Sequence, residues 1–162
     1  MAIDTVKDAR PGSHVRSPWA VVCAVAVLLA AMLMSGACYG HDDRQAAKSA
    51  GDHWLKLVAD GQYEKTWDEG SQLLKAATIR SHWVASLKET GELWGPVVSR
   101  ELLETKYLPK HEYSAANVVV DTVIFSYRTT FQNKAASKED LAVVRDADGV
   151  WRVYLYLSGM RL

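Results

Sequence analysis

Two spacings of apolar residues divide the chain, and the change between them falls near Gly95. Upstream of that position, apolar side chains recur at helical intervals, for example at Ala50, Trp54 and Val58. This spacing gathers them on one side of a helix. With glycines as stop signals, the pattern predicts helices over residues 42–60, 62–69 and 78–91, and a brief turn or helix over residues 71–77.

Downstream of Trp94-Gly95-Pro96, β-branched and aromatic runs alternate with turn residues. This composition is typical of strands, and it predicts them over residues 97–108, 117–131, 140–145 and 150–157. Asp148-Gly149 predicts a hairpin between the last two strands, because glycine tolerates the positive φ of a tight turn. Helices followed by strands indicate an α+β domain, in which the N-terminal helices pack on one face of a curled, cone-like antiparallel sheet of about four strands.

Residues 1–38 have a different pattern, which is typical of an export signal. Basic residues come first, a charge-free apolar run occupies residues 19–34, and small residues precede Cys38. Three interpretations stay open: a signal peptide cleaved after Ala37, a lipoprotein signal with Cys38 as the lipidated residue, and an uncleaved membrane anchor. Each of them predicts that the domain, residues 42–162, is exported and lies in the periplasm or at the cell envelope.

The composition limits the partners that this domain can have. The 162 residues leave room for one domain and a short leader. Lys and Arg together number 19, Asp and Glu also number 19, and the formal net charge is +0. Without a basic excess, nucleic acid is not an expected partner. Both cysteines, Cys23 and Cys38, belong to the leader, so the domain has no thiol for a disulfide or a thiolate metal site.

No metal or cofactor is predicted for the domain. Its histidines, together with one just before it, show no metal-ligand spacing such as HExxH. They are His41, His53, His82 and His111. The chain also lacks a nucleophile elbow, a Gly-rich phosphate loop and a Cys-His pair. Common routes to covalent or metal-assisted catalysis therefore have no signature in this sequence.

Asp121 is the one candidate general base. Strict alternation along residues 117–131 puts Asp121 on the same face as Phe125 and Tyr127, the face expected to meet the helices. A carboxylate among apolar groups suits a general acid or base, and Tyr63 or Tyr127 would then act as a hydrogen-bond donor. The alternative is a solvated Asp121 near the strand end, or one that a bulge turns outward.

Aromatic side chains are the remaining candidates for binding. Trp67 and Trp83 fall on the inward faces of predicted helices, and Phe125 falls on the inward face of the sheet. Such rings either line a ligand site or fill the core. Tyr154 and Tyr156 alternate with aliphatic residues, which predicts that both lie on one face of the sheet. If that face is open, it would bind a protein partner or a second copy of the chain.

A series of short motifs extends over residues 46–157. They are Trp54-Leu55, Asp60-Gly61-Gln62-Tyr63, Trp67, Trp83, Gly95 to Arg100, Thr129 to Lys134, Glu139, and Asp148 to Val153. Their order and spacing resemble the bacterial domain-of-unknown-function 4019 family. The resemblance implies a small exported bacterial protein with no assigned activity and no known catalytic residues. The last strand departs from the family pattern, because the bulky Tyr154-Leu155-Tyr156 stands where a small residue and a glycine are expected before the aromatic residue.

The helix-then-sheet order also looks like the cone-shaped fold of nuclear transport factor 2-like domains and ketosteroid isomerases. That likeness implies a fold and no function. Our leading hypothesis is a non-enzymatic module that binds a small apolar ligand or a protein partner, or that forms a homodimer through its sheet. The alternatives are a small pocket enzyme of isomerase or hydratase type with Asp121 as its base, and an envelope-tethered structural protein.

Overall fold

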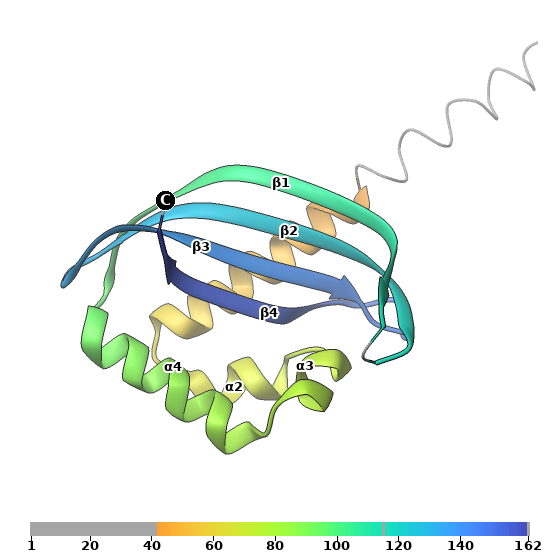
Figure 1. Cartoon of the computed structure of the whole chain (residues 1–162), viewed down its shortest axis with the longest axis horizontal. Helices are drawn as coiled ribbons and strands as arrows, with labels where there is room; N and C mark the ends of the chain where they lie inside the picture. Colours follow the sequence, from red (N-terminus) through yellow and green to blue (C-terminus); the bar gives the residue numbers. More distant parts are fainter. Residues whose placement is uncertain (1–41, 115, 162) are drawn as a thin grey trace, which may run out of the picture. The chain divides into compact units, whose positions relative to one another are not determined.

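Four helices precede four strands in the computed structural model, which describes residues 42–114 and 116–161 (Figure 1). A helix over residues 42–59 comes first. The elements that follow are α2 (Tyr63–Asp68), α3 (Gln72–Ala77), α4 (Arg80–Trp94), β1 (Val97–Tyr113), β2 (Val118–Phe131), β3 (Lys134–Arg145) and β4 (Trp151–Met160). The predicted order of helices and then strands is confirmed.

The four strands form one antiparallel sheet in the order β1-β2-β3-β4, so that each strand pairs with its neighbours in sequence. The helix over residues 42–59 crosses one face of this curled sheet, and α2 and α4 lie beside β4 (Figure 1). Gly149, with a φ of 81°, lies in the turn between β3 and β4. The α+β architecture predicted from the sequence is therefore confirmed.

The core lies between the first helix and the face of the sheet that it covers, which we call the inner face. Alternate residues of β2 point into this core, among them Val123, Phe125 and Tyr127. The helix approaches closely at Gly51, where an added Cβ would lie 3.0 Å from a Leu141 methyl carbon. Burying a side chain of the size of phenylalanine stabilises a fold by about 1.5–3 kcal/mol, so these contacts hold the helix on the sheet.

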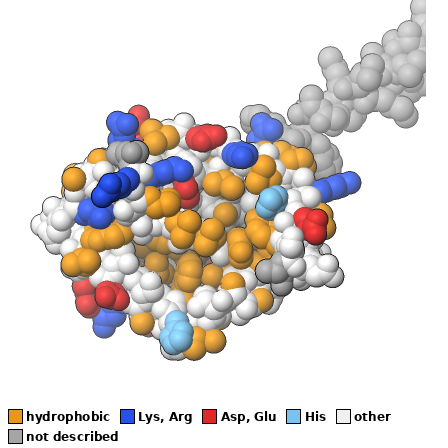
Figure 2. All heavy atoms as spheres, viewed as in Figure 1, with side chains coloured by type: hydrophobic (Ala, Val, Ile, Leu, Met, Phe, Trp, Pro, Cys, Tyr) orange, Lys and Arg blue, Asp and Glu red, His pale blue; other side chains and the backbone are white. Residues whose placement is uncertain are grey.

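The opposite face, which we call the open face, is not covered by the first helix. Ile124, Ala142 and Leu155 form one row across β2, β3 and β4 on this face. Leu155 is 37% exposed and the nearby Leu157 is 44% exposed. Figure 2 views the molecule from this side and shows hydrophobic side chains gathered over the middle of the sheet. The middle of the sheet is therefore apolar on both faces, and solvent reaches part of the open face.

Several element boundaries differ from the sequence prediction, for example the end of β4, which lies at Met160 rather than at residue 157. α4 continues through Gly91 to Trp94. β1 passes Pro109 because the register with β2 shifts between Leu108 and His111, and a proline is tolerated at such a bulge on an edge strand. β3 starts at Lys134 rather than Asp140, because the polar segment after Phe131 is a tight hairpin whose strands continue to pair.

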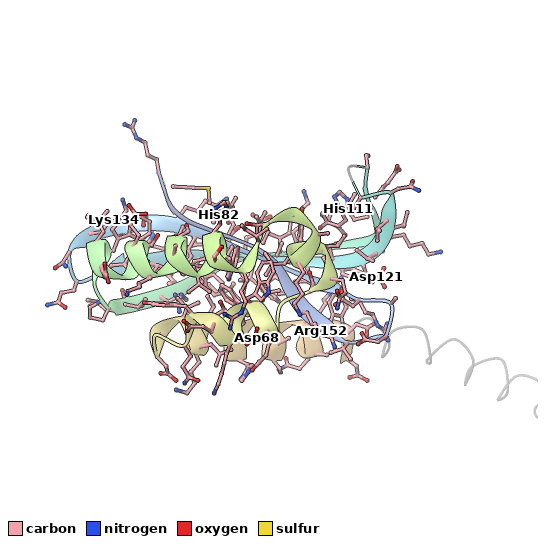
Figure 3. All side chains as sticks on the ribbon, turned by 90° about the horizontal axis from the view of Figure 1, so that it is seen from below. Asp68, His82, His111, Asp121, Lys134 and Arg152 are labelled. Carbon is pink, nitrogen blue, oxygen red and sulfur yellow. The ribbon has the colours of Figure 1, made fainter. Side chains whose placement is uncertain are left out.

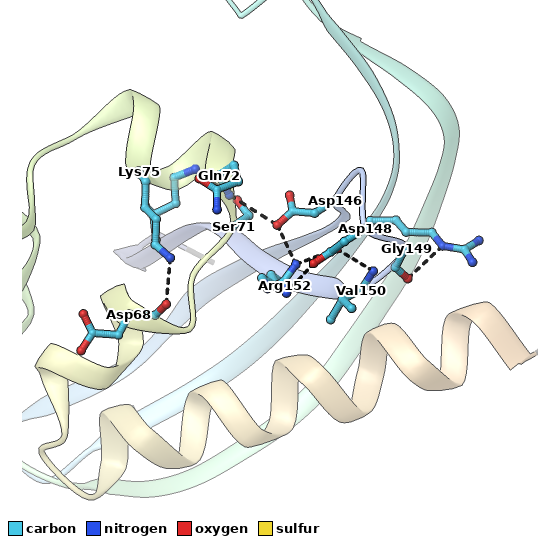
Figure 4. A network of polar contacts seen from close by, with 11 residues as sticks. Asp68, Ser71, Gln72, Lys75, Asp146, Asp148, Gly149, Val150 and Arg152 are labelled. Atoms are coloured by element: carbon cyan, nitrogen blue, oxygen red, sulfur yellow. Dashed lines mark hydrogen bonds and ion pairs between the residues drawn. The ribbon is translucent and has the colours of Figure 1, made fainter.

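A polar network fixes the start of α3 on the β3–β4 hairpin (Figure 4). The Ser71 hydroxyl accepts a hydrogen bond from the Leu74 N–H at 3.1 Å, which caps the helix. The Asp146 carboxylate accepts hydrogen bonds from Arg152 Nη1 at 3.1 Å and from the Gln72 N–H at 3.4 Å. Since Asp146 is 9% exposed, these hydrogen bonds attach α3 to the β3–β4 hairpin at a position largely shielded from solvent.

The leader predicted over residues 1–38, with Cys38 in it, lies outside the described residues. None of the helices in the described part of the chain is long and apolar enough to cross a membrane. The choice among a signal peptide, a lipoprotein signal and an anchor therefore stays a prediction from the sequence.

Candidate functional site

A cavity of about 350 Å³, which we call the Arg100 cavity after a residue that lines it, opens between the end of the first helix, α4 and the sheet. That volume is at the lower end of the range for small-molecule sites. Its apolar and aromatic walls come from Val58, Tyr63, Leu87, Val97, Phe131 and Tyr156. The charged side chains at this cavity are Arg100 from β1 and Asp60 from the turn after the first helix. A pocket of this kind can enclose a small apolar molecule and offer it a polar contact.

Arg100, which lines this cavity, forms a bidentate ion pair with the Glu139 side chain. Arg100 Nε donates to Glu139 Oε2 at 2.6 Å, and Arg100 Nη2 donates to Oε1 at 3.0 Å. The Glu139 side chain is fully buried, and the Arg100 side chain is 18% exposed. Two parallel bonds between a guanidinium and a carboxylate fix both groups in one plane, so Arg100 has a defined orientation.

Two hydroxyl groups complete the surroundings of Glu139. Thr129 Oγ1 donates to Oε2 at 2.6 Å, and the Tyr156 hydroxyl donates to Oε1. Burial raises the pKa of the Tyr156 phenol above its usual range, and the neighbouring negative charge of Glu139 raises it further. All groups that contact this carboxylate are donors, as an ionised carboxylate requires. One residue from each of the four strands therefore meets at Glu139.

The guanidinium of Arg100 keeps donors that Glu139 does not use. Burial lowers the pKa of Arg100, but the hydrogen bonds and the charge of Glu139 outweigh this, and the pKa is raised overall. An arginine carries five N–H donors, and Glu139 engages the Nε and Nη2 groups. Among the described residues, no other acceptor is hydrogen-bonded to Arg100. The remaining N–H groups are thus available to a molecule in the cavity that Arg100 lines.

Tyr127 supports Arg100 from below. The guanidinium carbon lies 5.9 Å from the centroid of the Tyr127 ring, within the range of a cation–π contact. Burial raises the pKa of Tyr127 to about 12. Within residues 42–114 and 116–161, the buried Tyr127 hydroxyl has no hydrogen-bond partner. Its ring thus contributes packing beneath the ion pair, while its hydroxyl contributes no bond there.

Residues 50–156 match a family model described as "Protein of unknown function (DUF4019)". The chain belongs to the DUF4019 family. The match extends over more than half of the chain and includes Arg100, Thr129, Glu139 and Tyr156. No curated protein and no solved structure matches the chain. The likeness to nuclear transport factor 2-like domains is therefore not confirmed by a related structure.

In this DUF4019 domain, Asp121 lies far from the Arg100 cavity and lines a different cavity of about 610 Å³, together with Lys110 and Arg145. Its carboxylate accepts a hydrogen bond from the Lys110 N–H at 2.9 Å, at the bulge in β1. Figure 3 shows Asp121 near one end of the sheet and Lys134 near the other. Asp121 and Tyr127 are six positions apart on β2, which corresponds to up to roughly 20 Å along an extended strand. Asp121, Tyr63 and Tyr127 are therefore not brought together in one pocket.

The predicted aromatic residues lie in three kinds of environment. Phe125 is 1% exposed in the core. Trp67 is half-buried on α2. Trp83 is also half-buried, and its Nε1 donates to Thr66 Oγ1 at 2.9 Å. Only Tyr63 and Tyr156, among the residues proposed from sequence, line the Arg100 cavity. The tryptophan positions thus fit packing more directly than ligand contact.

The prediction that Tyr154 and Tyr156 share one face of the sheet is wrong. The register between β3 and β4 shifts, because Val153 pairs with Val143 while Leu155 pairs with Ala142. Tyr154 is the extra residue of this bulge, so the alternation is broken there. Tyr156 turns inward, with its ring centroid 5.2 Å from that of Trp54. Tyr154 instead packs against Tyr113, with ring centroids 4.9 Å apart.

Sequence reasoning missed Arg100, Thr129 and Glu139 as site residues. A signal was present, because all three belong to the motifs that carry the family resemblance. Glu139 also alternates with Leu141 along the strand, which places a carboxylate on an apolar face. Within the described ranges, no three His, Cys, Asp or Glu side chains cluster as metal ligands. His53 lies on the surface, where its Nε2 atom is 2.7 Å from Glu69 Oε2.

Proposed function

We propose that this DUF4019 domain is a non-enzymatic module that binds a small, largely apolar molecule in the Arg100 cavity. The observation that carries the proposal is the arrangement of Arg100. One edge of its guanidinium is fixed by the buried Glu139, and the side chain also lines a cavity with apolar walls. Ligand sites commonly combine such walls with a few fixed polar groups.

The polar groups of the cavity favour binding over catalysis. A general base needs a lone pair that can reach the substrate, but Glu139 already accepts four hydrogen bonds from protein donors. The raised pKa of Tyr156 makes its phenol a poor acid near neutral pH. Asp121, the base of the isomerase-type alternative, lies at the far end of the sheet (Figure 3). The geometry therefore supports a fixed contact rather than a proton transfer.

A matched pair of substitutions tests the binding proposal. Val97 lines the cavity, whereas its neighbour Val98 is 68% exposed. Val97→Trp should fill the cavity, and Val98→Trp adds the same ring outside it. We would titrate the purified full chain with 2-nonanone, octanoate and octylammonium by calorimetry. The proposal is supported if at least one probe binds the wild-type chain saturably, fails to bind Val97→Trp, and still binds Val98→Trp. Absence of binding by all three probes would overturn it.

We also propose that the domain is exported and works at the cell envelope. The basic, apolar and small-residue segments of residues 1–38 support this location. Intact-mass measurement of the membrane and soluble fractions separates the three forms of the leader. A lipid mass on Cys38 that Cys38→Ala removes indicates a lipoprotein, a shortened soluble chain indicates a cleaved signal, and a full-length membrane-bound chain indicates an anchor. A full-length chain in the cytosol would contradict export.

A second copy of the chain is the other candidate partner, at the open face. The specific observation is that Leu155 and Leu157 are large, exposed and close together there. Glu104 and Lys106 flank the same face through their pairing with β2, so a two-fold-related copy can bring opposite charges together around the apolar centre. Sedimentation analysis should then show a dimer that Leu157→Lys dissociates and Val98→Lys does not. A wild-type monomer at high concentration would remove this candidate.

A further inference from the structure

We infer that the ligand of the Arg100 cavity is a neutral molecule whose apolar body carries a hydrogen-bond acceptor such as a carbonyl oxygen. Carboxylates and alkylammonium ions of the same size bind this cavity more weakly. This inference concerns the same cavity as the proposed function and rests on that function, because it names the chemical class of ligand. The charges around the cavity determine this preference.

The ion pair that Arg100, a lining residue of the cavity, forms with Glu139 is electrically balanced. Arg100 carries one positive charge, and Glu139 cancels it at contact distances of 2.6 and 3.0 Å. Thr129 and Tyr156 donate to the same carboxylate, which stabilises its negative charge in the interior. The guanidinium therefore presents hydrogen-bond donors to the cavity without a net attraction for an anion. A carbonyl oxygen can accept such a bond and brings no charge that must be desolvated.

A carboxylate ligand would meet unfavourable electrostatics in this cavity. It would lose its hydration and would share one guanidinium with Glu139, and like charges at such distances repel. Asp60 adds another carboxylate to the lining, although Lys56 pairs with it at 2.7 Å. An alkylammonium ion would be no better placed, because Arg100 carries the same charge and offers only donors, and the Asp60 carboxylate is already paired with Lys56. The apolar walls favour the hydrocarbon part of all three probes equally.

The three probes test the preference for a neutral ligand directly, because they are similar in size and differ in charge. 2-Nonanone is the neutral acceptor, octanoate is its anionic counterpart, and octylammonium is the cation. We expect 2-nonanone to bind the wild-type chain about tenfold or more tightly than octanoate, a difference of about 1.4 kcal/mol. Octanoate or octylammonium binding more tightly than 2-nonanone would overturn the inference and leave the proposed function standing. Binding of none of the probes would overturn both.

A variant that changes the charge balance gives a second, independent readout. Glu139→Gln keeps the shape of the side chain but leaves Arg100 with its full positive charge. The ratio of octanoate affinity to 2-nonanone affinity should then rise at least about tenfold above its value in the wild type. Glu69→Gln makes the same chemical change at a surface position, beside His53. It should leave the ratio of the probe affinities at its wild-type value. If Glu139→Gln folds, as judged by circular dichroism, but leaves the ratio of octanoate affinity to 2-nonanone affinity unchanged, the charge argument is wrong. If Glu139→Gln does not fold, the affinities of the three probes for the wild-type chain alone decide whether the inference holds.

Discussion

Arg100 of β1 and Glu139 of β3 are bonded to each other across β2, the strand that separates them in the sheet. Thr129 of β2 is the Cα partner of Arg100, and it also donates to the Glu139 carboxylate. The ion pair therefore connects the edge strand to the interior of the sheet through side chains. At the same time it sets the direction of the guanidinium that lines the cavity.

Removal of one member of this pair should destabilise the domain strongly. Arg100→Met leaves a buried carboxylate without its cation, and Glu139→Leu leaves a largely buried guanidinium without its anion. We expect each single change to lower the free energy of unfolding by about 3–5 kcal/mol. The double variant should lose much less than the sum, because no unpaired charge remains in the interior. Urea denaturation of all four proteins measures the coupling; additive losses would show that the pair is not coupled.

The Tyr156 hydroxyl should contribute to stability through Glu139. Tyr156→Phe keeps the ring against Trp54 but removes a donor to a buried carboxylate. We expect a loss of about 1.5–3 kcal/mol, typical of a hydrogen bond to a charged group. Tyr154→Phe is the matched control, since it keeps the ring contact with Tyr113 and should change stability by less than about 0.5 kcal/mol. Equal losses in chemical denaturation would argue against a special role for Tyr156.

Most of the fold could be predicted from the sequence because it depends on local patterns. Helical spacing around Trp54 and alternation around Phe125 each place a residue on an apolar surface, and those surfaces must meet. The start of β3 could not be predicted in this way. Its first residues, from Lys134 onward, are polar because they lie near the hairpin, and pairing with β2 keeps them extended.

The site was harder to predict because its residues are distant in sequence. Arg100 and Glu139 are 39 positions apart, and each by itself reads as a charged surface residue of a strand. Only the register of three strands brings them together on the inner face. The bulge at Tyr154 has a similar origin, since an extra residue in one strand is defined by its partner strand. The alternation of Glu139 with Leu141 indicates a carboxylate on an apolar face, but neither its pairing with Arg100 nor the bulge has a local signature in the amino-acid pattern.

Alkaline pH should destabilise the domain through Tyr127. Its pKa is about 12 in the folded state and about 10 in an unfolded chain. Between these values the folded protein keeps the phenol proton and the unfolded chain loses it, so stability is full below about pH 10 and falls as the pH rises toward 12. The free energy of unfolding should fall by about 2–3 kcal/mol through this residue.

Tyr127→Phe should make the decline of stability with pH shallower. At neutral pH the same change should be close to neutral or slightly stabilising, because it removes a buried hydroxyl that has no partner among the described residues. Urea midpoints between pH 8 and pH 11.5 measure both effects. Parallel curves for the two proteins would show that the phenol of Tyr127 titrates as it does in an unfolded chain.

Gly91 and Tyr63 should be coupled at the wall of the cavity. A Cβ added at Gly91 would lie 2.4 Å from the Tyr63 phenol oxygen, but 3.5 Å from the adjacent ring carbon. Inside a helix, alanine is favoured over glycine by about 1 kcal/mol. We therefore expect Gly91→Ala to stabilise the domain by about that amount in a Tyr63→Phe background, where the oxygen is gone. In the wild-type background the gain should be smaller, since the Tyr63 ring must move.

The four proteins of this double-mutant cycle can be compared by thermal and urea denaturation. A smaller gain with Tyr63 present than with phenylalanine present would measure the cost of displacing the phenol. Because Tyr63 lines the cavity, the displacement should also change 2-nonanone affinity in Gly91→Ala, and this change should be smaller in the Tyr63→Phe background. Equal stability gains in the two backgrounds would show that the close approach of Gly91 to Tyr63 is not what excludes a side chain at position 91.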